Sequence, residues 1–455
     1  MKQLFTIFTI LFVSCNTKLQ QPTVVVPQRY LYSSAEDSTT LENEWWRIFE
    51  DTILNRLITT ALKSNYDLQS AASKIEEAKA QMKVVRSQYL PSFNLGRSAS
   101  ISGDGEGKVN DQYIVEPYAS WEIPLFGSLK AATTAAKSNV EYAKWQYKGI
   151  ELSLAAEIAT TYFTLLQYQR NLSTARESSR LREQTATLVD SLYVHGMATK
   201  LNREQAYSLL YTSDADIPLY ERAIAQTKLS LNTLLGQEPE PVDYITDDNI
   251  ISAKYIPLSI PVGLPSDLLY RRPDIMSTFS NLTAAAASAK LARIERFPTI
   301  TLTGDGGVVS GDISKLFSKG SWVWDTMLSL AQPLYRFGAL KNSEKGAIER
   351  YNQALIAYRA NLLTAISEVE KALVAIDTYR LQLERYKSLV DANAAINRLT
   401  NALYQNGLSA YLDVIDAERT LYNSQMEYSN LIASQYINYV NLCKALGGGI
   451  KNGAQ

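Results

Sequence analysis

The stretch YIVEPYASWEIPLFGSLKAATTAAK, residues 113–137, changes its pattern of apolar residues partway along. Up to Ile123, apolar and polar side chains alternate, which is the two-residue period of a strand with one apolar face and one polar face. A proline then ends the alternation, and a long helical pattern begins beyond Gly127. We therefore expect a strand that leads directly into a long helix.

Three other segments alternate in the same way: PSFNLGRSASI at 91–101, TITLTGDGG at 299–307 and WVWDTMLSLAQP at 322–333. Each has about the 9–11 residues that a tilted membrane strand needs. Arg97 interrupts the apolar face of the first. Polar loops that contain glycine join the strands in pairs. These loops have neither the spacing of a calcium loop nor that of a phosphate loop. We therefore interpret them as extracellular loops that join the strands and not as ion-binding loops.

The number of expected strands sets a condition on assembly. Beyond the N-terminal segment no stretch is long and apolar enough for a transmembrane helix, so a membrane-spanning form of this chain has to be a closed barrel. Four strands are too few, since the smallest such barrels have about eight. Three copies of the chain would supply twelve.

The helical patterns carry a seven-residue repeat of apolar side chains. In the second half of the chain the repeat comprises Leu355, Leu362, Val369, Ile376, Leu383 and Val390, and in the first half it comprises Ile158, Leu165 and Leu172. A repeat of this kind drives helices to supercoil around one another. The segment from Gly338 to Tyr404 contains no proline, and at about 1.5 Å per residue it would form a rod of roughly 100 Å.

The chain is an internal duplication. LYVHG at 192–196 recurs as LYQNG at 403–407, and three glycines of the first half, Gly127, Gly196 and Gly236, recur at one constant interval as Gly338, Gly407 and Gly447. Each half has a helix, two strands and two long helices that meet at a glycine. We expect a signal peptide at 1–14, a first repeat at 15–252 and a second repeat at 253–455.

The composition excludes several classes of function. Lys and Arg number 45 and Asp and Glu number 46, so the chain lacks the basic excess that nucleic-acid binding requires. One His and two Cys leave almost no means of building a metal site from those ligands. An enzyme with a histidine base would depend on His195 alone. We therefore expect no catalysis, no metal and no cofactor.

The N-terminus, MKQLFTIFTILFVSC, has the features of an export signal. Its apolar run from Leu4 to Val13 is too short to span a membrane. Ser14 followed by Cys15 resembles a bacterial lipoprotein box, which makes Cys15 the expected lipidated first residue of the mature chain. The residue after it is Asn16 and not the aspartate that marks inner-membrane retention, which favours the outer membrane. A plain signal peptide with an incidental cysteine is the alternative.

Several motifs together resemble one family. WWRIFEDTILNRLI from Trp45, GLPSDLLYRRPDI at 263–275, and the junctions PLFG and PLYRFG resemble the TolC family of outer-membrane efflux channels, in the lipoprotein branch that serves RND-type pumps. The resemblance implies a mixed α and β membrane protein that forms a homotrimer. Four strands per chain would build a shared twelve-stranded β-barrel, and the long helices a periplasmic coiled-coil tunnel. Pro273 and Asp274 form a good helix start, so we interpret RRPD as structural.

NGLSAYLDVIDAERTLY, residues 406–422, holds the expected gate. Asp413 and Asp416 lie three residues apart and share one face of a helix, where like charges repel and do not stabilise the helix. LDVIDA resembles the aperture motif of the family, which implies that both carboxylates face the tunnel near Tyr404. Six carboxylates from three chains would form a cation filter. A solvated outer face of a coiled coil is the alternative.

Two positions depart from the family pattern at this end. Some members brace the closed tunnel with an arginine two residues past the second-repeat glycine and an aspartate six past the first-repeat glycine. Here those positions hold Ser409 and Asn202. We therefore expect closure to depend on other contacts.

The two glycine junctions are the expected docking tips. His195, Gly196 and Met197 form one tip, and Asn406, Gly407 and Leu408 form the other. The resemblance implies that a periplasmic adaptor protein docks there and connects the channel to an inner-membrane RND-type pump. For His195 the alternative is an exposed turn residue without a partner protein.

The expected function is that of a passive exit duct of a tripartite efflux system, anchored by lipid in the outer membrane and extending into the periplasm. A wide duct makes few selective contacts, so the sequence does not name a cargo. Two alternatives are a duct for type I protein secretion and a coiled-coil scaffold lipoprotein without a pore. The strand segments separate a channel from a scaffold.

Overall fold

The computed structural model describes residues 27–32, 44–103, 105, 109–240 and 265–449. These residues form two compact units, which we name by their content. The strand unit includes Glu76–Tyr142 and Thr278–Arg359, and the helical unit includes Ala143–Ser277 together with neighbouring segments before residue 76 and after residue 359. The two longest helices, α4 (Ser128–Val194) and α8 (Ala339–Gln405), each contribute residues to both units.

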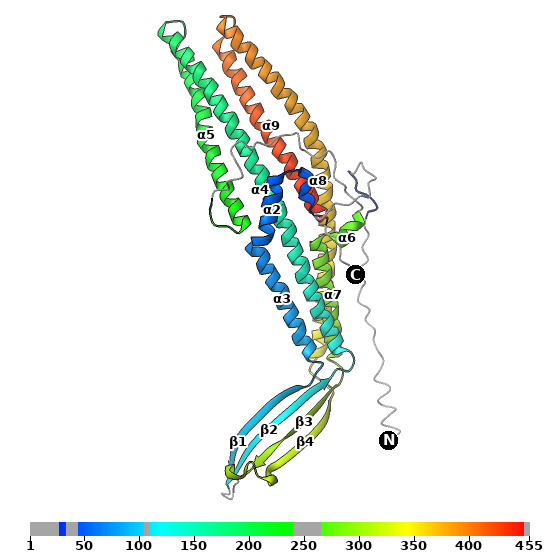
Figure 1. Cartoon of the computed structure of the whole chain (residues 1–455). Coiled ribbons are helices and arrows are strands. Elements are labelled where there is room, and N and C mark those ends of the chain that lie inside the picture. The colour runs from blue at the N-terminus through cyan, green and yellow to red at the C-terminus, as the bar shows by residue number, and fades with distance from the viewer. Residues whose placement is uncertain (1–26, 33–43, 104, 106–108, 241–264, 450–455) are drawn as a thin grey trace. The chain divides into compact units, whose positions relative to one another are not determined.

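The strand unit contains one sheet of four antiparallel strands, in the order β1-β2-β3-β4 (Figure 1). The strands are β1 (Ser92–Gly103), β2 (Val109–Ile123), β3 (Thr299–Ser310) and β4 (Trp322–Ala331). All four expected strands are confirmed. Two short turns, η4 (Ile313–Lys315) and η5 (Lys319–Ser321), lie in the loop between β3 and β4.

The register gathers large apolar side chains on one face of the sheet, which Arg97 interrupts. Leu302 on β3 lies opposite Trp121 on β2 and Leu328 on β4, and directly opposed residues project to the same side. Large side chains on this face are exposed within the chain, among them Phe93, Leu95, Trp322, Trp324, Leu328 and Leu330. The other face carries Glu116, Glu122, Asp305 and Asp325. The expected division into apolar and polar faces is therefore confirmed.

Each strand pair is bordered by helices, with a strained turn where the second strand ends. Helices α3 (Tyr66–Ser87) and α7 (Pro273–Ile294) precede β1 and β3. At the turns into α4 and α8, Phe126 and Phe337 have φ angles of 57° and 48°, in the left-handed region that non-glycine residues rarely adopt. Phe126 stacks on Phe297 with ring centroids 5.1 Å apart, and Phe337 contacts Tyr335 edge to face at 4.9 Å.

The helical unit is built from two helical hairpins. Helix α4 pairs with α5 (Lys200–Leu235), and α8 pairs with α9 (Tyr411–Ala445), as Figure 1 shows. The shorter elements are η1 (Trp45–Phe49), α2 (Thr52–Ser64), η3 (Pro265–Asp267) and α6 (Leu268–Arg271). The expected helix from Gly338 to Tyr404 is confirmed as α8. The seven-residue repeat is buried at Ile158, Leu165, Leu172, Leu355, Leu362 and Val369, and half-buried at Ile376, Leu383 and Val390.

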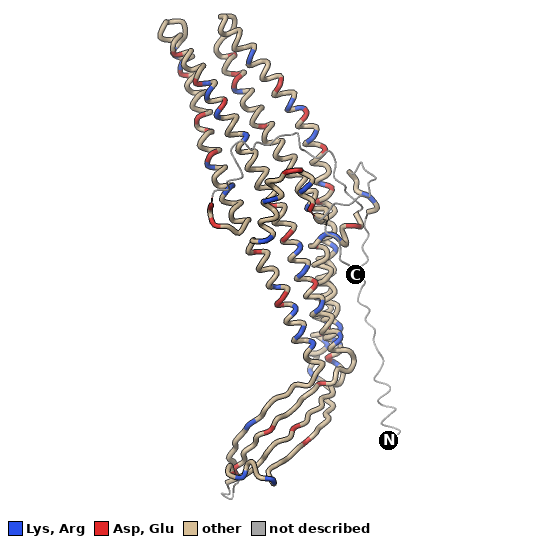
Figure 2. The backbone as a smooth tube through the Cα atoms, in the orientation of Figure 1, with Lys and Arg blue, Asp and Glu red and all other residues tan. Residues whose placement is uncertain are grey.

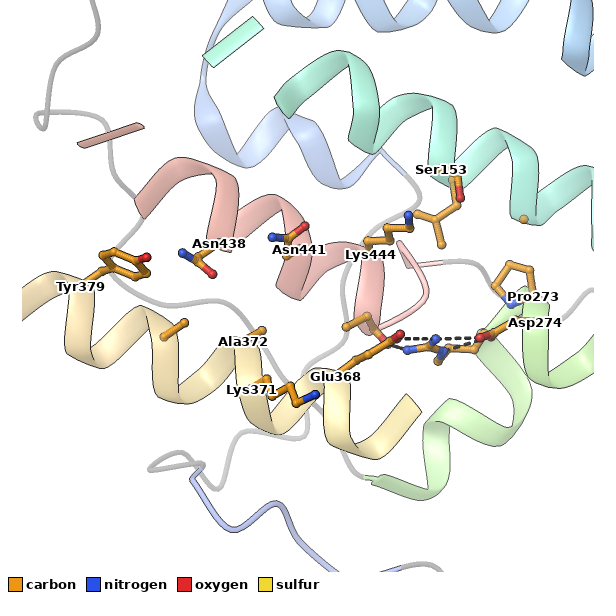
Figure 3. A pocket seen from close by; sticks show the side chains of 15 residues that line it. Ser153, Pro273, Asp274, Glu368, Lys371, Ala372, Tyr379, Asn438, Asn441 and Lys444 are labelled. Atoms are coloured by element: carbon orange, nitrogen blue, oxygen red, sulfur yellow. Dashed lines mark hydrogen bonds and ion pairs between the residues drawn. The ribbon is translucent and has the colours of Figure 1, made fainter. Parts of the chain in front are cut away.

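Arg272 of the RRPD motif is a structural hub. Its buried guanidinium binds both carboxylate oxygens of Asp274, at 3.0 and 2.7 Å, and the carboxylate of Glu368 on α8 at 2.7 Å. A further N–H donates to the carbonyl of Ala445 at 3.0 Å. Figure 3 shows Asp274 and Glu368 directed toward one another across this group. Pro273 is the first residue of α7, so the expected helix start is confirmed.

Charged residues are spread along the helices of the helical unit. Acidic and basic positions alternate along α4, α5, α8 and α9 without a long run of one sign (Figure 2). Among the described helices, none has a stretch that is both long enough and apolar enough to cross a membrane.

Candidate functional site

Both hairpins turn through the same backbone motif. Gly196 and Gly407 have φ angles of 75° and 72°, a left-handed conformation that glycine adopts without strain. The amide that follows each glycine donates to a carbonyl five residues back, from Met197 to Leu192 at 2.8 Å and from Leu408 to Leu403 at 2.9 Å. This pair of Schellman turns satisfies the last carbonyls of α4 and α8. Both glycines were expected at hairpin junctions, and the backbone there requires them.

The first tip is held by side chains from both of its helices. Thr199 accepts a hydrogen bond from the amide of Asn202 at 3.1 Å and caps α5. Arg203 on α5 forms an ion pair with Asp190 on α4 and lies over the ring of Tyr207 at 5.3 Å. The exposed ring of His195 donates from Nδ1 to the carbonyl of Ser191 at 2.8 Å.

At the second tip the cap comes from a residue inside the helix and not from the residue before it. Ala410 precedes α9 and has no side-chain acceptor. Instead, the carboxylate of Asp413 accepts from the backbone amide of Ala410 at 3.1 Å and from the hydroxyl of Ser409 at 2.7 Å. A carboxylate in this position satisfies a free amide and lies at the positive end of the helix dipole. The expectation that the acidic pair does not stabilise the helix is therefore wrong for Asp413.

Asp416 has no comparable contact. Its side chain is exposed, and within the described residues no hydrogen bond or ion pair reaches its carboxylate. Its neighbours Val414 and Ile415 are buried at 1% and 4% exposure, so the helix has a distinct inner face and a distinct solvent face. Asp413 and Asp416 share the solvent face.

Tyr404 connects the end of α8 to the start of α9. Its ring centroid lies 5.3 Å from that of Tyr411, at an interplanar angle of 49°. Both tyrosines pack against an apolar cluster that joins α4, α5 and α9 and includes Ala186, Val189, Ala206, Leu209, Leu210, Val414 and Ile415. Burial raises the pKa of both phenols above the ordinary value. The structure thus places Tyr404, at the end of α8, at the same hairpin tip as Asp413, at the start of α9.

A buried charged cluster near this tip has no counterpart among the residues expected from the sequence. Arg182 on α4 and Glu418 on α9 are 3% and 10% exposed, with Nε and Oε2 3.9 Å apart. The Arg182 guanidinium lies over the ring of Tyr422 at 4.9 Å, and Tyr422 donates to Asp216 on α5 at 2.6 Å. The sequence did hold a signal: a second seven-residue series runs beside the first through Leu154, Thr161, Tyr168 and Ala175, and Arg182 is its next member and the first charged one.

Some expected features lie outside the described residues. Cys15 and the signal peptide are among them, so lipidation stays a prediction. The boundary between the two repeats, at residues 252 and 253, also lies outside the described ranges.

Known proteins match the chain over nearly its whole length. The family model described as outer membrane efflux protein matches residues 57–237 and again 264–448. The chain is 33% identical over 420 residues to the toluene efflux pump outer membrane protein TtgF of Pseudomonas putida, covering 90% of this chain and 86% of that protein. It is 30% identical over 443 residues to the probable outer membrane lipoprotein SilC of Salmonella typhimurium, covering 96% and 95%.

Solved structures share the fold. A crystal structure of CusC superposes with a TM-score of 0.84 at 28% identity, covering 96% of this chain and 100% of that one. The open state of the MtrE outer membrane channel of Neisseria gonorrhoeae gives a TM-score of 0.84 at 27% identity, covering 96% and 99%.

The comparisons confirm the expected fold class and function at the level of the family. Its members are outer-membrane channels for efflux and not enzymes. The fold expected from the sequence, with mixed helices and strands and two copies of one plan, is that of the TolC-type channels. The chain belongs to the outer membrane efflux protein family.

Proposed function

We propose that three copies of this chain form a passive exit channel whose periplasmic end is gated by α9. The observation that carries the gate is the exposed Asp416, which has no partner within the described residues although the opposite face of its helix is buried. Three such helices around one axis would bring Asp413 and Asp416 of each chain together. Crowded carboxylates repel one another, and mobile cations relieve the repulsion.

The trimer is supported by the sheet. Within the described residues β1 and β4 each have one strand neighbour, and the sheet has a large apolar face exposed. The outer edges of β1 and β4 present backbone N–H and C=O groups that can pair with another strand, and closure of a barrel removes every such edge. Three sheets joined β1 to β4 would make the twelve-stranded β-barrel in outer-membrane lipid, and the polar face with its four carboxylates would line the channel.

The partners follow from the tips. Met197 and Leu408 are 71% and 74% exposed and occupy equivalent positions in the two Schellman turns. Exposed apolar residues at a rigid turn suit a protein partner, which we propose to be a periplasmic adaptor that connects the channel to an inner-membrane RND-type pump. TtgF is named for toluene efflux and CusC for cation efflux, so we propose that the pump, and not this duct, selects the cargo.

The deciding experiment is to isolate the protein from outer membranes and record from it in a planar bilayer. A trimer that resists SDS and conducts ions is the expected result. A monomer, or a trimer that never conducts even after Asp413 and Asp416 are both changed to Ala, would support the scaffold instead. A channel that conducts ions but exports a protein, and not small molecules, would support the type I secretion duct.

A further inference from the structure

Helix α9 contacts the first hairpin through three successive layers. The layer nearest the tip is the apolar cluster around Val414 and Ile415. The next contains Glu418, which faces Arg182 of α4. The third contains Tyr422 and Met426, which pack with Ala175 of α4. The middle layer places two opposite charges of α4 and α9 against one another, and Glu418 lies within one and a half turns of both aperture carboxylates.

The charged layer is poorly satisfied for so deep a site. One N–H of Arg182 donates to the carbonyl of Leu209 at 3.0 Å, but its Nε and the Oε2 of Glu418 have no hydrogen-bond partner among the described residues. The two atoms are 3.9 Å apart, within attraction but beyond a hydrogen bond. Both side chains line a cavity of about 270 Å³, which Asn397 of α8 also borders.

The free energy of a buried ion pair depends steeply on the distance between its two charges. Removing two charges from water is costly, and their mutual attraction offsets that cost only while they face one another. Burial raises the pKa of Glu418 and lowers that of Arg182, because it removes water from both charges. If α9 moved away from α4, Glu418 would lose the attraction of Arg182, and Arg182 would keep only the weaker attraction of Asp216 on α5. The pair therefore disfavours intermediate positions of α9.

The pair also fixes the rotation of α9. Glu418 is two residues past Asp416, and residues two apart on a helix point about 200° apart. Thus, when Glu418 faces Arg182, Asp416 must face away from the first hairpin. Ser409 and Asn202, the positions of the family's ion-pair lock, have only local partners here, Asp413 and Thr199 respectively.

We propose that Arg182 and Glu418 are positioning residues that hold α9 in the closed arrangement of the gate, in the role that Ser409 and Asn202 cannot fill. This inference rests on the proposed function, because it takes α9 to be the gating helix. Opening then requires α9 to separate from α4 and to expose both charges together. Tyr422 supports the arrangement, because its hydroxyl is bound by Asp216 and its ring lies under the guanidinium.

The test compares Arg182→Met, Glu418→Leu and the double variant in planar bilayers. Each single variant removes the strongest counter-charge of the buried group that remains, and we expect its open probability to rise by roughly tenfold or more. The double variant replaces the pair by apolar groups of similar size. Because the two residues act through one contact, we expect its open probability to rise no further than that of the single variants. The open single variants should keep the cation preference of wild type, because Asp413 and Asp416 remain.

Arg176 and Glu221 provide a matched control. They form an ion pair at 2.8 Å between α4 and α5, about half exposed, and within the described residues neither has an ion pair or hydrogen bond to α9. Arg176→Met and Glu221→Leu should leave the open probability unchanged. A trimer that opens equally after loss of this pair would show a general loosening of the first hairpin and would overturn the proposal.

The remaining outcomes are also decisive. Single variants that form stable trimers but stay as closed as wild type would overturn the proposal, as would a double variant in which the effects of the two single variants add. Should a single variant fail to assemble, Glu418→Gln keeps the shape and removes the charge, and a closed channel in that variant would equally overturn it. A protein that never conducts, even with Asp413 and Asp416 both changed to Ala, refutes the proposed channel itself, which separates that failure from this one.

Discussion

The two hairpin tips share a backbone turn and differ in how charge is distributed around it. At the first tip, Thr199 caps α5 and Arg203 pairs with Asp190 across the hairpin. At the second tip, Asp413 caps α9 from within the helix, and Asn401 and Val414 occupy the positions equivalent to Asp190 and Arg203. The first hairpin is therefore tied internally, whereas the second lacks this ion pair.

The difference shows what duplication can change at low cost. Both tips keep glycine where the backbone is left-handed, because any other residue would strain the turn. Both keep half of a capping box, one from the threonine before the helix and one from the carboxylate inside it. The side chains around this fixed turn have diverged, and under the proposed function the first copy would support the second, which would move as the gate.

The largest expected effect concerns the charge at the second tip. Changing Asp413 and Asp416 together to Asn keeps an acceptor for the amide of Ala410 while removing the charge. We expect the channel to lose its cation preference, measured as the reversal potential across a salt gradient. The difference should be greatest below about 0.1 M salt, where screening is weak.

The equivalent change at the first tip is the control for this prediction. Asn202→Asp with Gln205→Asp places acids at the corresponding positions of α5. If only α9 lines the aperture, this variant should leave the reversal potential close to that of wild type. An unchanged reversal potential in the Asn pair at low salt would mean that Asp413 and Asp416 do not face the pore.

The next effect concerns the shared turn. Gly196→Leu or Gly407→Leu places a branched side chain in the left-handed region, at a cost of roughly 1–2 kcal/mol. We expect trimers that still assemble but cross-link to the adaptor several-fold less. Gly346→Ala, near the N-terminal end of α8 with open space around it, should cross-link normally. Full adaptor capture by both tip variants would contradict the assignment of the docking site.

A smaller effect should follow from completing the cap of the second tip. Ala410→Ser would add the missing side-chain acceptor before α9 and form a full capping box with Asp413, a gain of about 0.5–1 kcal/mol. Thr199→Ala removes the cap of α5 at the first tip and should lower the stability of that helix end. Hydrogen exchange of the amides of Asp413 and Asn202 measures both, and faster exchange at Asp413 in the serine variant would refute the capping geometry.

The smallest effect should come from the ion pair of the first tip. Both side chains of Asp190 and Arg203 are about one-third exposed, so solvent screens their attraction. Asp190→Asn should slightly speed hydrogen exchange at residues 195–199, and 1 M salt should abolish the difference from wild type. A difference that persists in high salt would show that Asp190 acts through packing.

Much of the fold was predictable because the periodic signals are strong. Strand alternation located β1 to β4, and the repeated glycines located both hairpin turns. The role of Asp413 was missed because spacing alone shows repulsion along the helix and cannot show that the helix begins two residues earlier. Arg182 was missed because a seven-residue repeat predicts apolar side chains, and a charge in its path is explained only by the partner opposite.

The aromatic residues at the two ends of β4 also set how deep the sheet lies in the bilayer. Trp322 and Trp324 are exposed at the start of the strand, and Tyr335 and the strained Phe337 are exposed just beyond its end. Aromatic rings favour the two levels where hydrocarbon meets headgroups. The length of β4, ten residues, therefore sets the membrane thickness that the sheet matches. In lipids with much longer acyl chains the membrane, and not the protein, would have to thin locally to match.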